Sequence, residues 1–140
     1  MHTLRFDQIE NKDGFYVVHS LVSAATAGNY GVIFTALHPC ELMMVAESHT
    51  AAGTNGSAVT LQIEKLLPSY ALDAGAEMLA TGFNLKSMVD VPVIKEGSDL
   101  INRQLLPGDR IALKDTGTLT AVAGVQVTLY FKRSGKGDYR

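Results

Sequence analysis

Apolar and polar residues alternate along much of the chain, and this alternation predicts β-strands. Between residues 59 and 64 every odd position is apolar and every even position is polar, so one face of the strand meets a core and the other meets water. The stretch 119–131 shows the same alternation over a greater length. Gly124 interrupts it and has no side chain to pack, so we expect a bulge or bend there that lets one long strand serve two sheets.

About eight strands are expected, separated by turn clusters rich in glycine, aspartate and asparagine. They are 15–23, 30–36, 40–50, 58–66, 78–86, 91–95, 109–114 and 119–132. Helix is limited to one short turn within 63–72, because Pro68 interrupts the run of helix-forming residues there. The sequence therefore predicts an all-β fold, a two-sheet antiparallel β-sandwich of jelly-roll-like form.

The length of 140 residues is that of one domain with one core. We expect residues 1–13 to be a polar N-terminal arm, residues 14–133 to be the β-sandwich domain and residues 134–140 to be a basic C-terminal tail. Both arms lack the alternating pattern of the strands, which suits contacts with neighbouring molecules.

The first expected strand is apolar on both of its faces. Tyr16, Val18 and Val22 alternate with a second apolar set that begins at Phe15. Both faces of such a strand are covered: one packs on the protein's own core, and the other packs on another molecule. We therefore expect Tyr16, Val18 and Val22 to form an interface with a second subunit.

Charge and hydropathy exclude several classes of partner. The net charge is −2, so the chain does not bind nucleic acid through its overall charge. The charge-free stretch 15–40 contains serine, threonine and the turn pair Gly28-Asn29, which does not suit a membrane span. The polar N-terminus lacks the apolar core of a secretory signal, so we expect a cytosolic start.

Cys40 is the single cysteine and the only candidate thiol nucleophile, with His19, His38 and His49 as possible bases. These residues do not occur in a recognisable catalytic motif. Cys40 follows a proline at the start of an expected strand, and we predict that it is a small buried hydrophobe. The alternation places it on one face with three other apolar residues, Leu42, Met44 and Ala46.

Glu47 and His49 are two residues apart on one strand face, a spacing that aims two metal ligands the same way. A zinc site needs a third and a fourth ligand, and the sequence does not supply them in a recognisable pattern. His19 interrupts an apolar face and is predicted to be a hydrogen-bonded core or interface residue. We therefore expect no enzyme activity, no catalytic residue, no cofactor and no metal.

The end of the chain is basic. Lys132, Arg133, Lys136 and Arg140 stand against Asp138, which gives residues 132–140 a net charge of +3. Such a run is either a solvated tail or a segment that docks on an acidic surface.

A resemblance to a known family covers most of the chain, from about residue 30 to residue 131. The segments that carry it are 34–66, 71–75, 83–86, 106–113 and 117–131, and they include the runs FTALHPCELMMVAESHTAAGTNGSAVTLQIEKL and LPGDRIAL. They are similar to segments of small virion proteins of tailed bacteriophages, specifically the capsid decoration (cement) proteins.

The resemblance implies a small β-sandwich that binds the outside of an assembled head and clamps neighbouring major capsid subunits, commonly as a trimer. It implies a homotrimer on the capsid surface of the virion, made in the host cytoplasm, with the major capsid protein as partner and without enzyme activity. The basic residues Lys132, Arg133, Lys136 and Arg140 are then candidate capsid-binding residues, and Tyr16, Val18 and Val22 belong to the candidate oligomer interface.

Two other functions stay open. A different virion component, such as a tail or head-fibre attachment domain, fits the same pattern of strands. A carbohydrate-binding module fits less well, because such modules stack exposed aromatic rings on sugars and this chain has no tryptophan.

Overall fold

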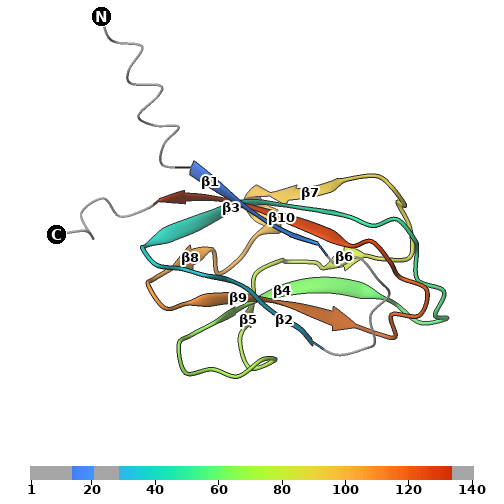
Figure 1. The fold of residues 1–140 in the computed structure, drawn as a ribbon, viewed down its shortest axis with the longest axis horizontal. Helices are drawn as coiled ribbons and strands as arrows, with labels where there is room; N and C mark the ends of the chain where they lie inside the picture. The colour runs from blue at the N-terminus through green and yellow to red at the C-terminus, as the bar shows by residue number, and fades with distance from the viewer. Residues whose placement is uncertain (1–13, 21–28, 134–140) are drawn as a thin grey trace, which may run out of the picture.

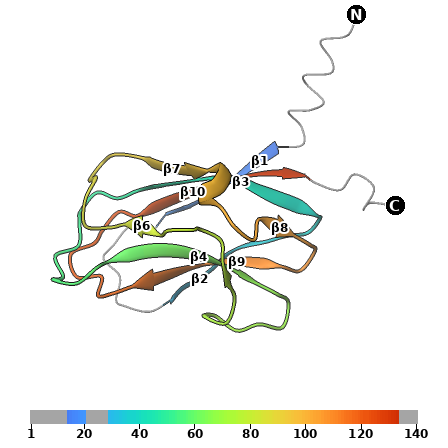
Figure 2. The ribbon, with the colours of Figure 1, turned by 180° about the vertical axis from the view of Figure 1, so that it is seen from behind.

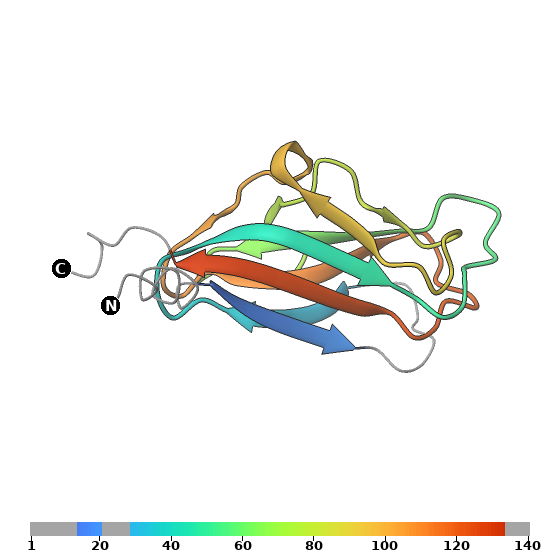
Figure 3. The same cartoon turned by 90° about the horizontal axis from the view of Figure 1, so that it is seen from above.

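The computed structural model describes residues 14–20 and 29–133, and the segments 1–13, 21–28 and 134–140 lie outside the described residues. Two antiparallel sheets pack face to face (Figures 1 and 3). The elements are β1 (Gly14–Ser20), β2 (Asn29–Thr35), β3 (Cys40–Ser48), β4 (Thr60–Leu66), β5 (Ala76–Glu77), β6 (Phe83–Asn84), β7 (Val93–Glu96), the 3₁₀ turn η1 (Gly97–Asp99), β8 (Gln104–Leu105), β9 (Arg110–Thr116) and β10 (Gln126–Arg133).

The strand order of the two sheets is that of a jelly roll. One sheet runs β1-β10-β3-β7, with β8 also paired to β3, and the other runs β2-β9-β4-β5, with β6 also paired to β4. The chain changes sheet at each step from β1 to β4, and the last strand lies beside the first (Figures 1 and 2). The predicted all-β, two-sheet antiparallel sandwich is confirmed, because the local alternation of each strand supplies one apolar face to a shared core.

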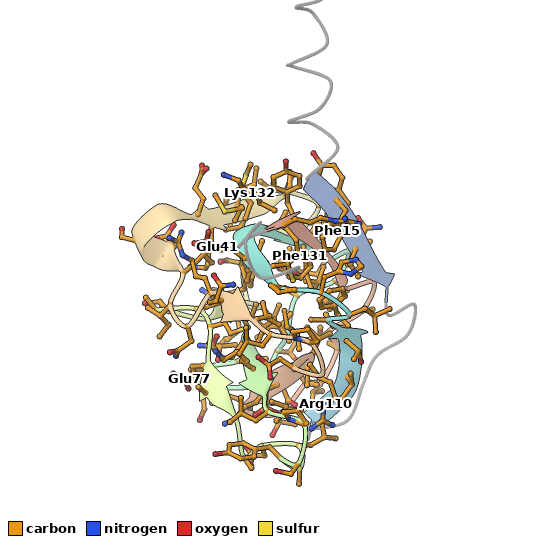
Figure 4. All side chains as sticks on the ribbon, turned by 90° about the vertical axis from the view of Figure 1, so that its left-hand side faces the viewer. Phe15, Glu41, Glu77, Arg110, Phe131 and Lys132 are labelled. Atoms are coloured by element: carbon orange, nitrogen blue, oxygen red, sulfur yellow. The ribbon has the colours of Figure 1, made fainter. Side chains whose placement is uncertain are left out.

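The core lies between the two sheets and is closed at one end by three phenylalanines. Phe131 of β10 stacks on Phe15 of β1 and on Phe34 of β2, with ring centroids 5.1 and 4.4 Å apart. Phe15 and Phe131 lie at the end of the sandwich where β1 begins and β10 ends (Figure 4), and Phe34 packs against both rings from the other sheet. No helix in the described part of the chain is long and apolar enough to cross a membrane.

The expected strand 78–86 is wrong as a continuous element, since only the two-residue strands β5 and β6 form near it. Between them the side chain of Gln62 takes the place of a strand partner. Its Nε2 donates to the carbonyl of Leu79 at 3.0 Å, and its Oε1 accepts from the N–H of Leu79 at 2.9 Å. A side chain therefore satisfies the backbone groups that a ladder would have paired.

The expected strand 119–132 begins only at Gln126, so the prediction of one long strand that serves both sheets is wrong. Leu119 and Val122 are buried, but they lie on a turn in which the N–H of Val122 donates to the carbonyl of Leu119. Gly124 does bend the chain, with a φ of +66°. The apolar alternation before it comes from a loop that folds onto the core.

No helix forms within 63–72. Strand β4 continues to Leu66, and a single turn follows in which the N–H of Tyr70 donates to the carbonyl of Leu67. The guanidinium of Arg110 holds this turn from β9 by donating to the carbonyls of Leu67, at 2.8 Å, and Tyr70.

Candidate functional site

The outward side of the β1-β10-β3-β7 sheet carries a row of apolar side chains. Strand register aligns Tyr16 of β1 with Tyr130 of β10, Tyr130 with Met44 of β3, and Ala46 of β3 with Ile94 of β7. The two tyrosine rings lie 4.7 Å apart. Tyr16 is 71% exposed, Ile94 55% and Met44 37%. We call Tyr16, Met44, Ala46, Ile94 and Tyr130 the outer apolar face.

The predicted interface residues belong to this face only as far as the structure describes them. Tyr16 points away from the core, since its ring packs on Tyr130 while Phe15 packs inside. Val18 lies opposite Thr128 in the ladder of β1 and β10, and its side chain, like the whole of Val22, lies outside the described part of the chain. Their role in an oligomer interface stays a prediction.

The predicted basic residues begin where the outer apolar face ends. Lys132 and Arg133 are exposed at the end of β10, and Lys132 lies two residues after Tyr130 on the same side of the sheet (Figure 4). Its partner in register on β3 is Glu41, whose carboxylate is 3.2 Å from the guanidinium of Arg103. Lys136 and Arg140 lie outside the described residues. The fold thus places the basic strand end directly beside the apolar row.

Sequence reasoning missed the other members of this face. Tyr130, Met44 and Ile94 come from three strands that are far apart in the sequence, and only the register brings them together. Tyr130 gave a local signal, because it is a large apolar residue at an even position of the alternation in 119–131, which is predicted to face water.

A β-bulge in β3 changes which of its side chains face the core. Met43 has no partner residue in β10, because the register shifts there. Cys40 is buried, as predicted. The prediction that Met44 and Ala46 share its face is wrong, since a bulge reverses the phase of the residues that follow it, and Glu47 is buried in their place.

Glu47 and His49 form a buried pair inside the sandwich. Each is 1% exposed, and His49 Nδ1 lies 2.9 Å from Glu47 Oε2. Glu47 Oε1 and His49 Nε2 have no hydrogen-bond partner among the described residues. In the register Glu47 lies between Val127 of β10 and Val93 of β7. Within this apolar layer, the carboxyl and the imidazole are thus hydrogen-bonded to each other through one atom each.

Within the described part of the chain, the pair does not belong to a larger ligand cluster. No group of three or more histidine, cysteine, aspartate or glutamate side chains placed to hold a metal occurs among the residues that the structure describes. The pair supplies two of the four ligands that zinc takes in a structural site. We therefore interpret the pair as a contribution to the stability of the fold, which unfolding measurements at several pH values can test.

We expect the stability supplied by Glu47 to fall as the pH rises. Burial raises the pKa of its carboxyl above the ordinary 4.5, and the hydrogen bond from His49 lowers it only in part. The folded protein therefore holds a proton at pH values where the unfolded chain has released it, and its free energy of unfolding decreases as the pH rises from 4.5 through the folded pKa. Urea unfolding at several pH values measures this effect. The free energy of unfolding of the wild type, relative to that of Glu47→Gln, should increase as the pH is lowered from neutrality through the folded pKa of Glu47 toward 4.5. Parallel curves for the two proteins would contradict this.

Cys40 lines a mainly apolar pocket of about 190 Å³ at the end of the sandwich that holds the three phenylalanines. The pocket is lined by Phe15, Phe34, Thr35, Leu37, His38 and Cys40. Burial, with a smaller contribution from Asp109, raises the pKa of the thiol to about 11. The thiolate, which is the nucleophilic form, is therefore scarce near neutral pH.

No family model and no curated protein matches the chain. The outer apolar face and the basic strand end beside it are therefore the features from which a function is proposed.

Proposed function

We propose that the protein is a capsid decoration (cement) protein, a structural virion protein that binds the outer surface of an assembled phage head and stabilises it. Its partner is the major capsid protein, and it acts as a homotrimer on the virion surface after synthesis in the host cytoplasm. The observation that carries the proposal is the outer apolar face of Tyr16, Met44, Ala46, Ile94 and Tyr130, with Lys132 and Arg133 at its end.

The composition of this surface is that of a protein–protein interface. Tyrosine and methionine are enriched at the centres of such interfaces, and charged residues lie at their rims. Single exposed apolar residues are common on monomers, whereas a contiguous set marks a site of interaction. Jelly rolls occur both in viral capsid proteins and in lectins, so the fold alone does not distinguish a virion function from sugar binding. The proposal therefore rests on the outer apolar face together with the sequence resemblance.

Two parts of the surface serve two contacts. Tyr16 lies on the edge strand β1 and suits the contact between subunits of a trimer. Lys132 and Arg133 suit a carboxylate-bearing region of the major capsid protein. Each exposed ion pair contributes only about 0–1 kcal/mol to binding. A trimer makes each contact three times at once, and this multivalency raises the overall affinity for the head.

Binding to undecorated heads tests the proposal. We expect the purified protein to co-sediment with undecorated phage heads, and we expect Lys132→Glu with Arg133→Glu to weaken binding at least tenfold at low salt, with a smaller effect at high salt. Lys114→Glu is the matched control. It makes the same kind of charge change on β9 of the other sheet, where the Lys114 ammonium lies 2.6 Å from Asp73, and it should bind like the wild type.

A wild-type protein that does not bind heads would overturn the proposal. Electron microscopy of virions that carry labelled protein separates the alternatives, because label on the tail or on fibres would assign it to a different virion component. Light scattering tests the trimer, and a strict monomer both free and bound would contradict that part.

A further inference from the structure

The loop that joins β3 to β4 carries an asparagine followed by a glycine, Asn55 and Gly56. It lies at the end of the sandwich opposite to the start of β1 and the end of β10 (Figures 1 and 3). Asparagine is a chemically labile residue, because the backbone nitrogen of the next residue can attack its side-chain amide. Glycine in the next position favours this attack, since it has no Cβ to obstruct the approach and lets the chain turn freely. The surrounding structure decides whether the reaction runs in the folded protein.

The fold leaves both reacting groups free. Among the described residues, no hydrogen bond is made by the N–H of Gly56 or by the side chain of Asn55. Gly56 and Ser57 are exposed and Asn55 is half-buried, so water and hydroxide reach the site. A Cβ added at Gly56 would meet no heavy atom within 4 Å. The attacking nitrogen therefore has open space beside it.

The residues on either side of the pair are held, in contrast to the pair itself. The N–H groups of Gly53 and Thr54 donate to carbonyls outside the loop at 2.9 and 3.1 Å. After the pair, the ammonium of Lys86 donates to the carbonyl of Ser57 at 3.1 Å. A chemical change at the pair therefore breaks none of the contacts that anchor the loop.

The two other asparagines whose side chains are described are engaged by the fold. Asn84 Oδ1 accepts from the N–H of Lys86 at 2.9 Å, and the N–H that follows Asn84 is itself hydrogen-bonded. Asn102 Nδ2 donates to the carbonyl of Glu77 at 2.7 Å. Leucine and arginine follow these two asparagines, and both are bulkier than glycine. Sequence and structure thus distinguish Asn55 from both.

We propose that Asn55 is a site of spontaneous deamidation in the folded protein. Hydroxide removes the proton of the Gly56 N–H, and the nitrogen attacks Asn55 Cγ. The N–Cγ bond forms and the Cγ–Nδ2 bond breaks, and Nδ2 takes protons from water and leaves as ammonia, which restores the hydroxide. Water then opens the resulting succinimide ring at either carbonyl and gives aspartate or isoaspartate. The product carries one more negative charge than the starting chain, whose net charge is −2.

Incubation of the full chain at mildly alkaline pH, followed by cleavage after glutamate, tests the inference. Peptide 48–64 contains Asn55 as its only asparagine. We expect this peptide to gain the mass that replacement of an amide –NH2 by –OH adds, and to become a substrate for an isoaspartyl methyltransferase. The rate in the folded chain should lie within about fivefold of the rate in a synthetic peptide of residues 48–64, because the fold does not engage the reacting groups. Asn84 and Asn102 should react at least about tenfold more slowly than Asn55.

Gly56→Val is the matched control. The φ of Gly56 is not positive and the space beside it is open, so valine fits without strain. Its branched side chain crowds the attacking nitrogen, so the variant should keep the melting temperature of the wild type and deamidate at least about tenfold more slowly. Greater than about fivefold protection of Asn55 in the folded chain relative to the peptide would overturn the inference. Equal rates in the wild type and Gly56→Val would overturn it too. Neither result bears on the proposed function, since the reaction needs only the loop and water.

Discussion

Replacing His49 with alanine is expected to lower the free energy of unfolding by about 3–5 kcal/mol. His49 and Glu47 are each 1% exposed, and their side chains are hydrogen-bonded to each other in this layer of the core. Removing the imidazole leaves the Glu47 carboxyl buried beside Val127 and Val93 without its partner. Urea unfolding followed by circular dichroism measures the loss, and this probe suits a chain that has no tryptophan.

The double variant Glu47→Leu with His49→Leu is the control. A buried polar pair can often be replaced by apolar residues of similar volume with little loss or with a gain in stability, so the double variant should be more stable than His49→Ala. A loss below about 1 kcal/mol in His49→Ala would show that the carboxyl finds water or another partner.

Replacing Phe131 with alanine is expected to cost about 3–5 kcal/mol of unfolding free energy. The side chain is fully buried, and its ring contacts Phe15 in its own sheet and Phe34 in the other. Its removal therefore leaves a cavity between the layers that two facing rings can fill only in part. Thermal and urea unfolding measure the loss.

Tyr130→Ala is the matched control for this prediction, because Tyr130 precedes Phe131 and points to the opposite side of β10. We expect it to cost about 1 kcal/mol or less in stability and to weaken trimer formation or head binding. The Phe131→Ala protein should bind normally at temperatures where it stays folded. If Tyr130→Ala is as unstable as Phe131→Ala, the outer apolar face is part of the protein's own core.

The fold class was predictable because the signals that define it are local. Alternation in 59–64 and 119–131 predicted β4 and β10, and both strands place their apolar residues in the core. The prediction that the even positions of β4 face water is wrong for Gln62 and Glu64, which are buried. Turn clusters ended the strands near the observed positions. Two-sheet packing follows because a strand with one apolar face must bury that face against another layer.

Strand boundaries went wrong where nonlocal contacts replaced the ladder. Gln62 pairs with the backbone of Leu79 and so divides the expected strand 78–86. A turn at Val122 takes the residues before Gly124 out of β10. Gln62 lies outside the stretch 78–86 in which that alternation was read, and Ala51, which pairs with Ala123 beside this turn, lies outside the stretch 119–131.

By itself the sequence determined that this protein is a β-sandwich, that Cys40 is buried and that Phe15 and Tyr16 face opposite ways. Only the tertiary structure decided which residues share a surface. The bulge at Met43 turned Met44 outwards and buried Glu47, and the register joined Tyr16, Tyr130 and Ile94 in one face. The physical reason is that alternation depends on the geometry of one strand, whereas bulge position and register depend on the free energy of pairing with strands distant in the chain.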